Sequence, residues 1–302
     1  MGVGMGAMER EGKGTLYVVA TPIGNLEDIT LRALRVLRKV DLIAAEDTRT
    51  TRRLLAAHSI RTPMVSYHEQ GNLRKGGGIV RRLKEGKDVA LVSEAGTPGI
   101  SDPGYELIQL CLTEGIEPVV IPGPSVVPAA LCVSGLPTNR FSFFGFLPRR
   151  RQERLRVLGQ LRGENGTLIF FESARRLAAT LQDIFEVLGD RKAALARELT
   201  KAFEEVKRGS VGQLLAWAKG CGTILGEVTL LVQGRVAEPP SMEDIKDRVE
   251  FLVKRCGLGD KEVVRLIHEE SGAPRKVVYG VLLNYRRNAG LAVVGVPRED
   301  KA

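Results

Sequence analysis

The sequence is poor in cysteine and histidine, and it has no long apolar run. Its four cysteines, at positions 111, 132, 221 and 256, are scattered, and it holds only three histidines. Neither a disulfide framework nor zinc-ligand spacing is present, so we expect reduced thiols and no metal. Apolar stretches such as FSFFGFL at 141–147 are far shorter than the roughly 20 residues that span a membrane. The opening MGVGMGAMEREGKG lacks the apolar segment of a signal peptide. These absences predict a cytoplasmic protein without membrane contact.

Basic residues are in excess and unevenly distributed. The net charge is +9 and the isoelectric point about 9.5. Between positions 140 and 162 there are seven arginines and a single acid, Glu153, and the stretch 74–87 holds six basic residues and one acid, Glu85. A solvated helix face usually mixes both signs, whereas a cluster of one sign attracts polyanions. We therefore expect a nucleic-acid partner, and RNA in particular.

Short apolar runs alternate with helical patterns in the first half of the chain. Strands are predicted at 15–20, 41–47, 63–69, 88–93 and 117–123, and helices at 31–40, 48–59, 79–86 and 104–115. This alternation is typical of a mostly parallel sheet in an α/β domain.

A second strand and helix set begins near residue 140, with strands predicted at 167–173, 192–199 and 226–234. The proline pair in VAEPPS (236–241) predicts a linker, and three helical segments without strand signal follow it. The predicted fold class is α/β, with two αβα domains and a small C-terminal helical region. The predicted parts are an N-terminal extension (1–14), an N-terminal α/β domain (15–130), a C-terminal α/β domain (131–236) and the helical region (237–302).

Three loops rich in glycine or proline follow predicted strands, at 21–25, 93–104 and 122–137. Ligands of open parallel sheets bind at the carboxyl ends of the strands, which predicts a ligand site where these loops meet. The loop LVSEAGTPGISDPG has neither the Lys-Ser/Thr pair of a triphosphate loop nor G-x-G-x-x-G. A nucleoside held by backbone groups, without a phosphate to cradle, fits this pattern better.

Several long segments carry a resemblance to a known family. These are TLYVVATPIGNLEDITLRALRVLRKVDLIAAEDTRTTRRLL, LVSEAGTPGISDPG, IPGPSVVPAAL, FFES and ARELTK. Together they resemble the bacterial small-subunit rRNA methyltransferase I group of the tetrapyrrole-methylase superfamily, over about residues 15–235 and more weakly beyond. The resemblance implies two αβα domains with S-adenosylmethionine (AdoMet) in the cleft between them. It also implies a homodimer that methylates a cytidine ribose 2′-hydroxyl in 16S rRNA.

The resemblance also implies which residues bind the cofactor. They lie on the three loops and on the second domain, and Glu94 stands where many relatives have Asp. The implied set is Ile23, Gly24, Ser93, Glu94, Ala95, Gly96, Thr97, Pro98, Ile100, Ser125, Val126, Leu199, Gly226 and Glu227.

Methyl transfer to a weakly acidic hydroxyl is helped by a base or by a charge that lowers the pKa of the hydroxyl. The candidates lie in AEDTR, YHEQGN and ARELTK. They are Glu46, Asp47, Arg49, His68, Arg197, Glu198 and Lys201. Each also has a structural interpretation, as an ion pair, a helix cap or a core histidine, and the sequence does not decide between them.

RNA contacts are predicted at Arg140, Arg149, Arg150 and Arg151, and a weaker candidate is the nearly charge-balanced C-terminal region. The nearby phenylalanines 141, 143, 144 and 146 belong either to a core or to a stacking surface. The substrate is expected to be small-subunit rRNA, within the assembled ribosomal subunit. Two alternatives remain at this stage: a related methylase with a non-RNA acceptor, and an RNA-binding assembly factor without catalysis.

Overall fold

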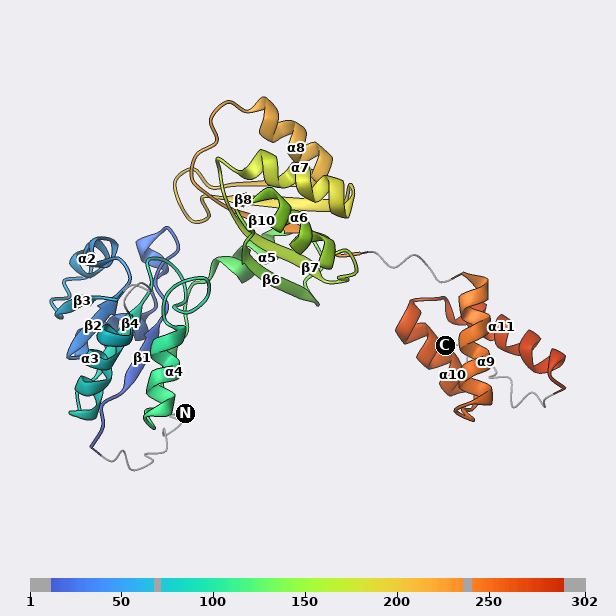
Figure 1. Cartoon of the computed structure of the whole chain (residues 1–302), viewed down its shortest axis with the longest axis horizontal. Helices are drawn as coiled ribbons and strands as arrows, with labels where there is room; N and C mark the ends of the chain where they lie inside the picture. Colours follow the sequence, from blue (N-terminus) through green and yellow to red (C-terminus); the bar gives the residue numbers. More distant parts are fainter. Residues whose placement is uncertain (1–11, 68–71, 236–240, 291–302) are drawn as a thin grey trace, which may run out of the picture. The chain divides into compact units, whose positions relative to one another are not determined.

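The computed structural model describes residues 12–67, 72–235 and 241–290, with residues 72–75 described by their backbone alone. The chain divides into two compact units, Met1–Gly234 and Arg235–Ala302 (Figure 1). The four-part division expected from the sequence stays a prediction at its finer boundaries. No helix in the described ranges is both long enough and apolar enough to cross a membrane.

The first lobe of the larger unit is a five-stranded sheet in the order β3-β2-β4-β1-β5, in which every paired strand is parallel. The strands are β1 (Leu16–Val19), β2 (Leu42–Ala45), β3 (Met64–Ser66), β4 (Val89–Val92) and β5 (Val119–Ile121). The helices are α1 (Leu31–Lys39), α2 (Thr48–Ala57), α3 (Asn72–Lys84) and α4 (Tyr105–Thr113), with a 3₁₀ turn at Leu26–Asp28. The parallel sheet expected for this half of the chain is confirmed.

Side chains of the central strands alternate between two helical layers. On β4, Val89 and Leu91 belong to the core formed with α3 and α4, while Ala90 and Val92 belong to the core formed with α1 and α2. All four residues are buried. A strand buried on both faces reads as a continuous apolar run, which is why the sequence pattern located it.

The second lobe contains a mixed sheet in the order β6-β7-β10-β8-β9, in which only the pair of β6 and β7 is parallel. Its strands are β6 (Phe141–Phe146), β7 (Thr167–Ser173), β8 (Lys192–Arg197), β9 (Glu205–Ser210) and β10 (Glu227–Val232). Helices α6 (Arg151–Gln160), α7 (Leu177–Leu188) and α8 (Val211–Gly220) pack on one face, and α5 (Val126–Ser134) packs on the other. The two αβα lobes of the predicted fold class are thereby confirmed.

Helix α5 corrects one expectation, because residues 126–134 were assigned to a loop. Ser125 occupies the N-cap position, and Gly135 ends the helix in the left-handed conformation. Pro128 lies in the first turn, where its missing N–H removes no helical hydrogen bond. The prolines and glycines of this segment therefore mark the ends of a helix rather than a loop.

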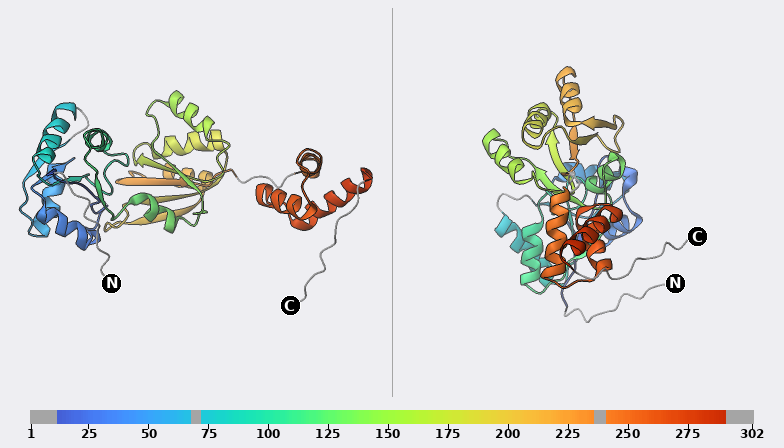
Figure 2. Two further views of the ribbon diagram at one scale, coloured as in Figure 1. Left: turned by 90° about the horizontal axis from the view of Figure 1, so that it is seen from below. Right: turned by 90° about the vertical axis from the view of Figure 1, so that its right-hand side faces the viewer.

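The described part of the smaller unit, residues 241–290, contains α9 (Met242–Lys254), α10 (Asp260–Ser271) and α11 (Arg275–Asn288), as predicted (Figure 2). It has a core of its own, which includes Val249, Val263, Ile267, Val278 and Leu282.

Candidate active site

The three loops expected to form a ligand site meet at one edge of the first sheet, because β4, β1 and β5 are neighbours. The N–H of Thr21, after β1, donates to the carbonyl of Gly96, after β4, at 2.8 Å, and Gly96 donates back at 3.1 Å. A Cβ on Gly96 would lie 3.5 Å from Ile23 and 3.9 Å from the carbonyl oxygen of Pro124, after β5. The expected convergence of the loops is therefore confirmed.

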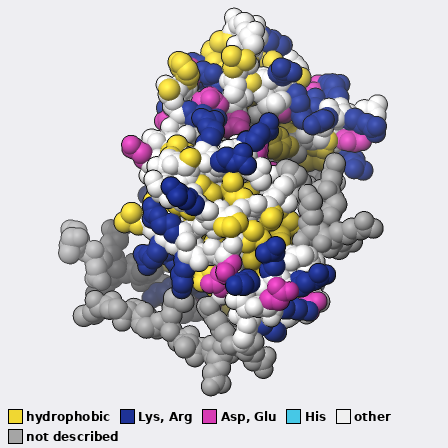
Figure 3. Space-filling model, turned by 90° about the vertical axis from the view of Figure 1, so that its left-hand side faces the viewer, with side chains coloured by type: hydrophobic (Ala, Val, Ile, Leu, Met, Phe, Trp, Pro, Cys, Tyr) yellow, Lys and Arg dark blue, Asp and Glu magenta, His cyan; other side chains and the backbone are white. Residues whose placement is uncertain are grey.

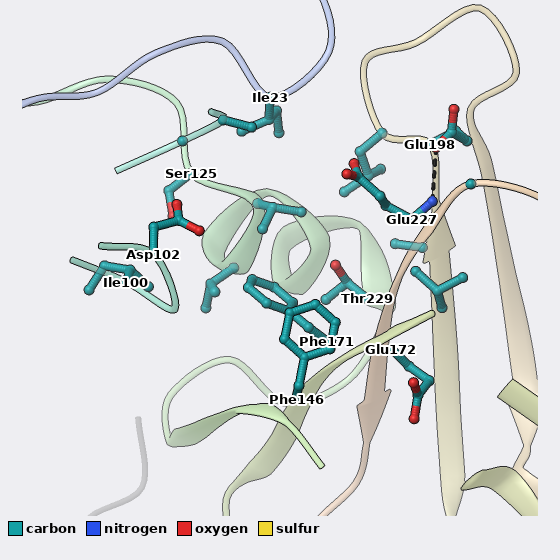
Figure 4. Close-up of a pocket in the computed structure, with 18 of the residues that line it drawn as sticks. Ile23, Ile100, Asp102, Ser125, Phe146, Phe171, Glu172, Glu198, Glu227 and Thr229 are labelled. Atoms are coloured by element: carbon teal, nitrogen blue, oxygen red, sulfur yellow. Dashed lines mark hydrogen bonds between the residues drawn. The ribbon is translucent and has the colours of Figure 1, made fainter. Parts of the chain in front are cut away.

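A cavity of about 290 Å³ opens between these loops and the α5 face of the second sheet (Figure 4). Its volume lies near the lower end of the range of pockets that hold small ligands, roughly 300–1,000 Å³. The first lobe contributes Ile23, Ala95, Gly96, Thr97, Ile100, Asp102 and Ser125; the second contributes Val126 and Val127 of α5 together with Phe146, Phe171, Glu172, Ser173, Ala196, Glu198, Leu199, Lys201, Gly226, Glu227, Val228 and Thr229.

Most residues in the predicted cofactor set line this cavity; the exceptions are Gly24, Ser93, Glu94 and Pro98. The buried hydroxyl of Ser93 donates to the carbonyls of Ala95 and Gly96, so this side chain shapes the loop. Glu94 points to Thr50 on α2, and its N–H donates to Glu46 at 3.0 Å. Gly24 packs against the backbone of Leu199. The cofactor assignment itself stays a prediction.

Two of the predicted catalytic residues, Glu198 and Lys201, lie on the cavity wall, in a strained turn after β8. Glu198 and Thr200 both adopt positive φ angles, of 51° and 63°. Lys201 Nζ lies 3.1 Å from Glu198 and 3.0 Å from Glu227. Burial alone would lower the pKa of Lys201, but hydrogen bonds to Glu227 and Glu198 outweigh burial and raise it. The N–H of Glu227 and the ammonium of Lys201 lower the pKa of Glu198. This cluster favours a charged lysine over a proton acceptor.

The other predicted catalytic residues that the structure describes do not line the cavity. Asp47 is the N-cap of α2, and hydrogen bonds from Arg49 lower its pKa to about 2. Arg197 binds Glu205 and the carbonyl of Leu225. Glu46 accepts the N–H of Glu94, next to the cavity loop. The remaining candidate, His68, lies outside the described residues.

Asp102 and Glu172 are titratable cavity residues that the sequence interpretation missed, and Asp102 is the one with a shifted pKa. It lies in the loop after β4, and burial raises its pKa to about 7. The negative charges of Glu46, Glu94 and Glu227 contribute to the rise, while a hydrogen bond from Ser93 opposes it. A carboxyl group with this pKa is poised to exchange a proton near neutral pH. The motif SDPG did not distinguish this residue, because Asp before Pro and Gly is also the ordinary composition of a turn.

The cavity wall carries more negative than positive charge. Among the described lining residues, Asp102, Glu198 and Glu227 bring carboxyl groups to the wall, whereas Lys201 is the one with a positive charge. Glu172 is buried and already bonded to Thr180 and Arg176 of the α6–α8 layer. The surplus favours a ligand that carries positive charge. No group of side chains in the described ranges has the composition of a metal site.

The arginines predicted to contact RNA differ in their surroundings. Arg151 bonds Asp183 at 2.9 Å and Glu186 at 2.7 Å, so it ties α6 to α7. Arg150 has one weaker pair, with Glu153 at 3.5 Å, and is 85% exposed. Arg140 and Arg149 are exposed, and neither has a salt bridge to a described residue. The structure thus leaves Arg140, Arg149 and Arg150 available to a partner and assigns Arg151 a structural contact.

A second basic surface lies on α1 and α2, which the sequence interpretation did not single out. These two helices hold seven basic residues and no acidic one: Arg32, Arg35, Arg38, Lys39, Arg49, Arg52 and Arg53. All seven are exposed. The face in Figure 3 shows many more basic than acidic side chains. Because Thr50 of α2 contacts Glu94, this surface adjoins the cavity loop.

Comparison with known proteins adds independent findings. The family model of Tetrapyrrole (Corrin/Porphyrin) Methylases matches residues 15–215. A ribosomal RNA small subunit methyltransferase I from Halalkalibacterium halodurans is 44% identical over 279 residues, which cover 90% of this chain and 96% of that protein. One from Thermotoga maritima is 49% identical over 222 residues, or 74% of this chain and 99% of that protein. The solved structure of a cobalt precorrin-4 methyltransferase matches with a TM-score of 0.58 and 20% identity, over 76% of this chain and 98% of that one, a likeness of fold alone.

Proposed function

The chain belongs to the tetrapyrrole (corrin/porphyrin) methylase family, and from that membership we propose a methyltransferase that acts on a cytidine ribose 2′-hydroxyl in small-subunit rRNA. It is AdoMet-dependent, like the methyltransferases it resembles. The observation that carries the proposal is the 41–49% identity to rRNA small subunit methyltransferases over most of the chain. The acceptor atom is the part of the proposal that goes beyond these names.

The cavity fits the charge of the proposed cofactor. When bound, AdoMet supplies an electrophilic methyl group on a positively charged sulfur, and it also carries an ammonium group. The surplus of carboxylates on the wall, with Asp102 and Glu227 on opposite lobes, suits such a cation. Gly96, Ser125 and Leu199 line the cavity from three separate segments without a phosphate-binding loop, which suits a nucleoside.

We assign the proton transfer to Asp102. Bound AdoMet would supply the methyl group to the ribose oxygen, and the Asp102 carboxylate would take the proton that the hydroxyl loses. A pKa near 7 makes this carboxylate a stronger base than an exposed aspartate, because burial destabilises its charge. Holding the hydroxyl in line with the methyl group supplies much of the remaining acceleration.

The proposed partner is RNA, which binds the α1–α2 surface together with Arg140, Arg149 and Arg150. These side chains are exposed and of one sign, as phosphate contacts require. We also propose a cytoplasmic homodimer. Exposed apolar side chains on the first lobe support it: Tyr105 and Leu112 on α4, and Val120 on the edge strand β5, are 67%, 42% and 60% exposed.

Two measurements test this proposal in order. Calorimetry with S-adenosylhomocysteine (AdoHcy), the demethylated product, tests the cavity, and methyl-labelled AdoMet added to ribosomal subunits or free rRNA tests the acceptor. If AdoHcy does not bind, the protein is not an AdoMet-dependent enzyme, and an RNA-binding factor is the remaining alternative. Label that appears only on a non-RNA acceptor would identify a related methylase of another substrate class.

A further inference from the structure

Phe146 is an exposed aromatic ring at the wall of the cavity. It is 59% exposed, and its ring centre lies 5.6 Å from that of Phe171, another lining residue, in an edge-to-face arrangement (Figure 4). Two phenylalanines of the same strand are packed inside instead: Phe143 against Phe171 at 4.8 Å, and Phe144 against Phe170 at 5.5 Å. Phe146 thus lines the cavity and still leaves most of its surface open to a partner.

A β-bulge directs this ring into the cavity. Phe143 pairs with Ile169 and Phe146 with Phe171, so three steps along β6 match two steps along β7. Without the extra residue, Phe146 would pair with Glu172, whose side chain points to the opposite face and bonds Thr180 of α7. The bulge therefore moves Phe146 from the α7 face of the sheet to the cavity face, which is a known role of bulges near active sites.

Gly145 makes the bulge possible and allows it to lie close to the first lobe. Its φ is +61°, and a Cβ there would lie 2.9 Å from the hydroxyl of Ser101. Ser101 is next to Ile100 and Asp102, the cavity residues of the loop after β4. Phe146 and Asp102, the residue to which the hydroxyl proton is assigned, therefore line the same cavity from two segments that touch at Gly145 and Ser101.

The surroundings of the ring favour a base of RNA as its partner. Arg149 and Arg150 follow Phe146 by three and four residues, and four residues of extended chain reach at most about 14 Å. Both arginines are exposed and leave room for phosphate oxygens. An exposed aromatic ring next to cations that can hold a sugar-phosphate backbone is the combination with which proteins bind unstacked bases of RNA.

We propose that Phe146 forms a base subsite, on which the base of the target nucleotide stacks after it leaves the RNA stack. The subsite rests on the proposed RNA methyl transfer and adds to it the position at which the target base binds. Stacking there places the attached ribose between the ring and Asp102, so that its 2′-hydroxyl enters the cavity while the base stays at the mouth. The ring is then a positioning residue for the acceptor and leaves the cofactor untouched.

The test compares Phe146→Leu, which keeps apolar volume but removes the aromatic face, with Phe146→Tyr, which keeps that face. Phe185→Ala, a 40% exposed phenylalanine of α7 outside the cavity, is the matched control. We expect Phe146→Leu to lower kcat/KM for the ribosomal RNA substrate by about 5- to 150-fold, the loss typical of one base–aromatic stack. Phe146→Tyr should stay near the wild type, and AdoHcy affinity should not change in any variant.

Three results would overturn the subsite, and they differ from failure of the proposed function. Equal kcat/KM for Phe146→Leu and the wild type would show that the aromatic face is not used. A loss of AdoHcy affinity as large as the loss of kcat/KM would assign the ring to the cofactor's adenine. A matching loss of kcat/KM in Phe185→Ala would trace it to folding rather than to stacking. In all three cases the wild type still methylates RNA, whereas a wild type that does not would overturn the proposed function and the subsite with it.

Discussion

Thr21 and Gly96 exchange a reciprocal pair of backbone hydrogen bonds, at 2.8 and 3.1 Å, and so join the loop after β1 to the loop after β4. The pair fixes the backbone on one side of the cavity before any ligand arrives, which reduces the entropy lost on binding. Gly96 has a φ of +79° and lines the cavity, so a side chain there would enter the space of a ligand.

Replacing Gly96 with alanine should therefore weaken AdoHcy binding, by about tenfold or more, because the added methyl group overfills the site. Gly99→Ala is the matched control: its φ is +85°, it lies in the same loop, and it does not line the cavity. Both variants bear the same backbone penalty of roughly 1–2 kcal/mol. Calorimetry measures the AdoHcy affinity of the two variants, and melting curves measure their stability. Together they separate a loss caused by backbone strain from a loss caused by contact with the ligand. Equal affinities in the two variants would place the ligand elsewhere.

Asp102→Asn should change stability in a pH-dependent way. The carboxyl has a pKa of about 7 in the folded chain, above its ordinary value of 3.8, so the folded state binds more protons between these pH values. The free energy of unfolding of the wild type therefore falls as pH rises from about 4 to 7. We expect the variant to melt above the wild type at pH 8 and level with it at pH 4. A constant difference between Asp102→Asn and the wild type across pH would contradict the buried carboxylate.

The same variant tests the proton acceptor. Asp102→Asn should lose most methyl transfer, by roughly 10²–10⁴-fold, because an amide cannot take the hydroxyl proton. For the wild type, kcat should rise with pH through about 7 and then level off, as Asp102 ionises. Single-turnover transfer at several pH values measures both effects. If Asp102→Asn keeps the wild-type rate, Asp102 is not the proton acceptor, and the hydroxyl loses its proton to water instead.

Arginines 149 and 150 should contribute to RNA affinity in a salt-dependent way. Their joint replacement by alanine should reduce the slope of log affinity against log salt by about 1.5, since each lost phosphate contact removes roughly 0.7–0.9. Arg151→Ala should leave that slope unchanged and lower the melting temperature instead, because it breaks the pairs with Asp183 and Glu186. Filter binding of RNA at several salt concentrations measures this slope for each variant. If Arg151→Ala reduces the salt slope and the replacement of Arg149 and Arg150 does not, the RNA contacts Arg151 instead.

The sequence predicted the parts of this site that depend on backbone pattern. Buried strands followed by glycine and proline located the loop around Gly96, and the order of the strands then brought the loops together. The resemblance to known methyltransferases predicted Leu199 and Glu227, which no local pattern singles out, and both line the cavity.

Features that depend on neighbours distant in sequence were missed. The elevated pKa of Asp102 arises from burial and from Glu46, Glu94 and Glu227, three groups on different segments. The bulge at Gly145 is not visible in FSFFGF, because a continuous apolar run gives no alternation from which a shift in register can be read. Strand β9 was overlooked because its half-exposed, charged sequence EVKRGS has no apolar run.

The acceptor atom is the central claim, and alkaline digestion of labelled RNA tests it most directly. Small ribosomal subunits that lack the modification are incubated with methyl-labelled AdoMet and the enzyme, and the extracted RNA is hydrolysed with alkali. A methyl group on a ribose 2′-oxygen blocks attack on the adjacent phosphodiester, so the label should remain in an alkali-resistant dinucleotide with a methylated cytidine at its 5′ end. Label in ordinary mononucleotides would show methylation of a base and would contradict the proposed reaction.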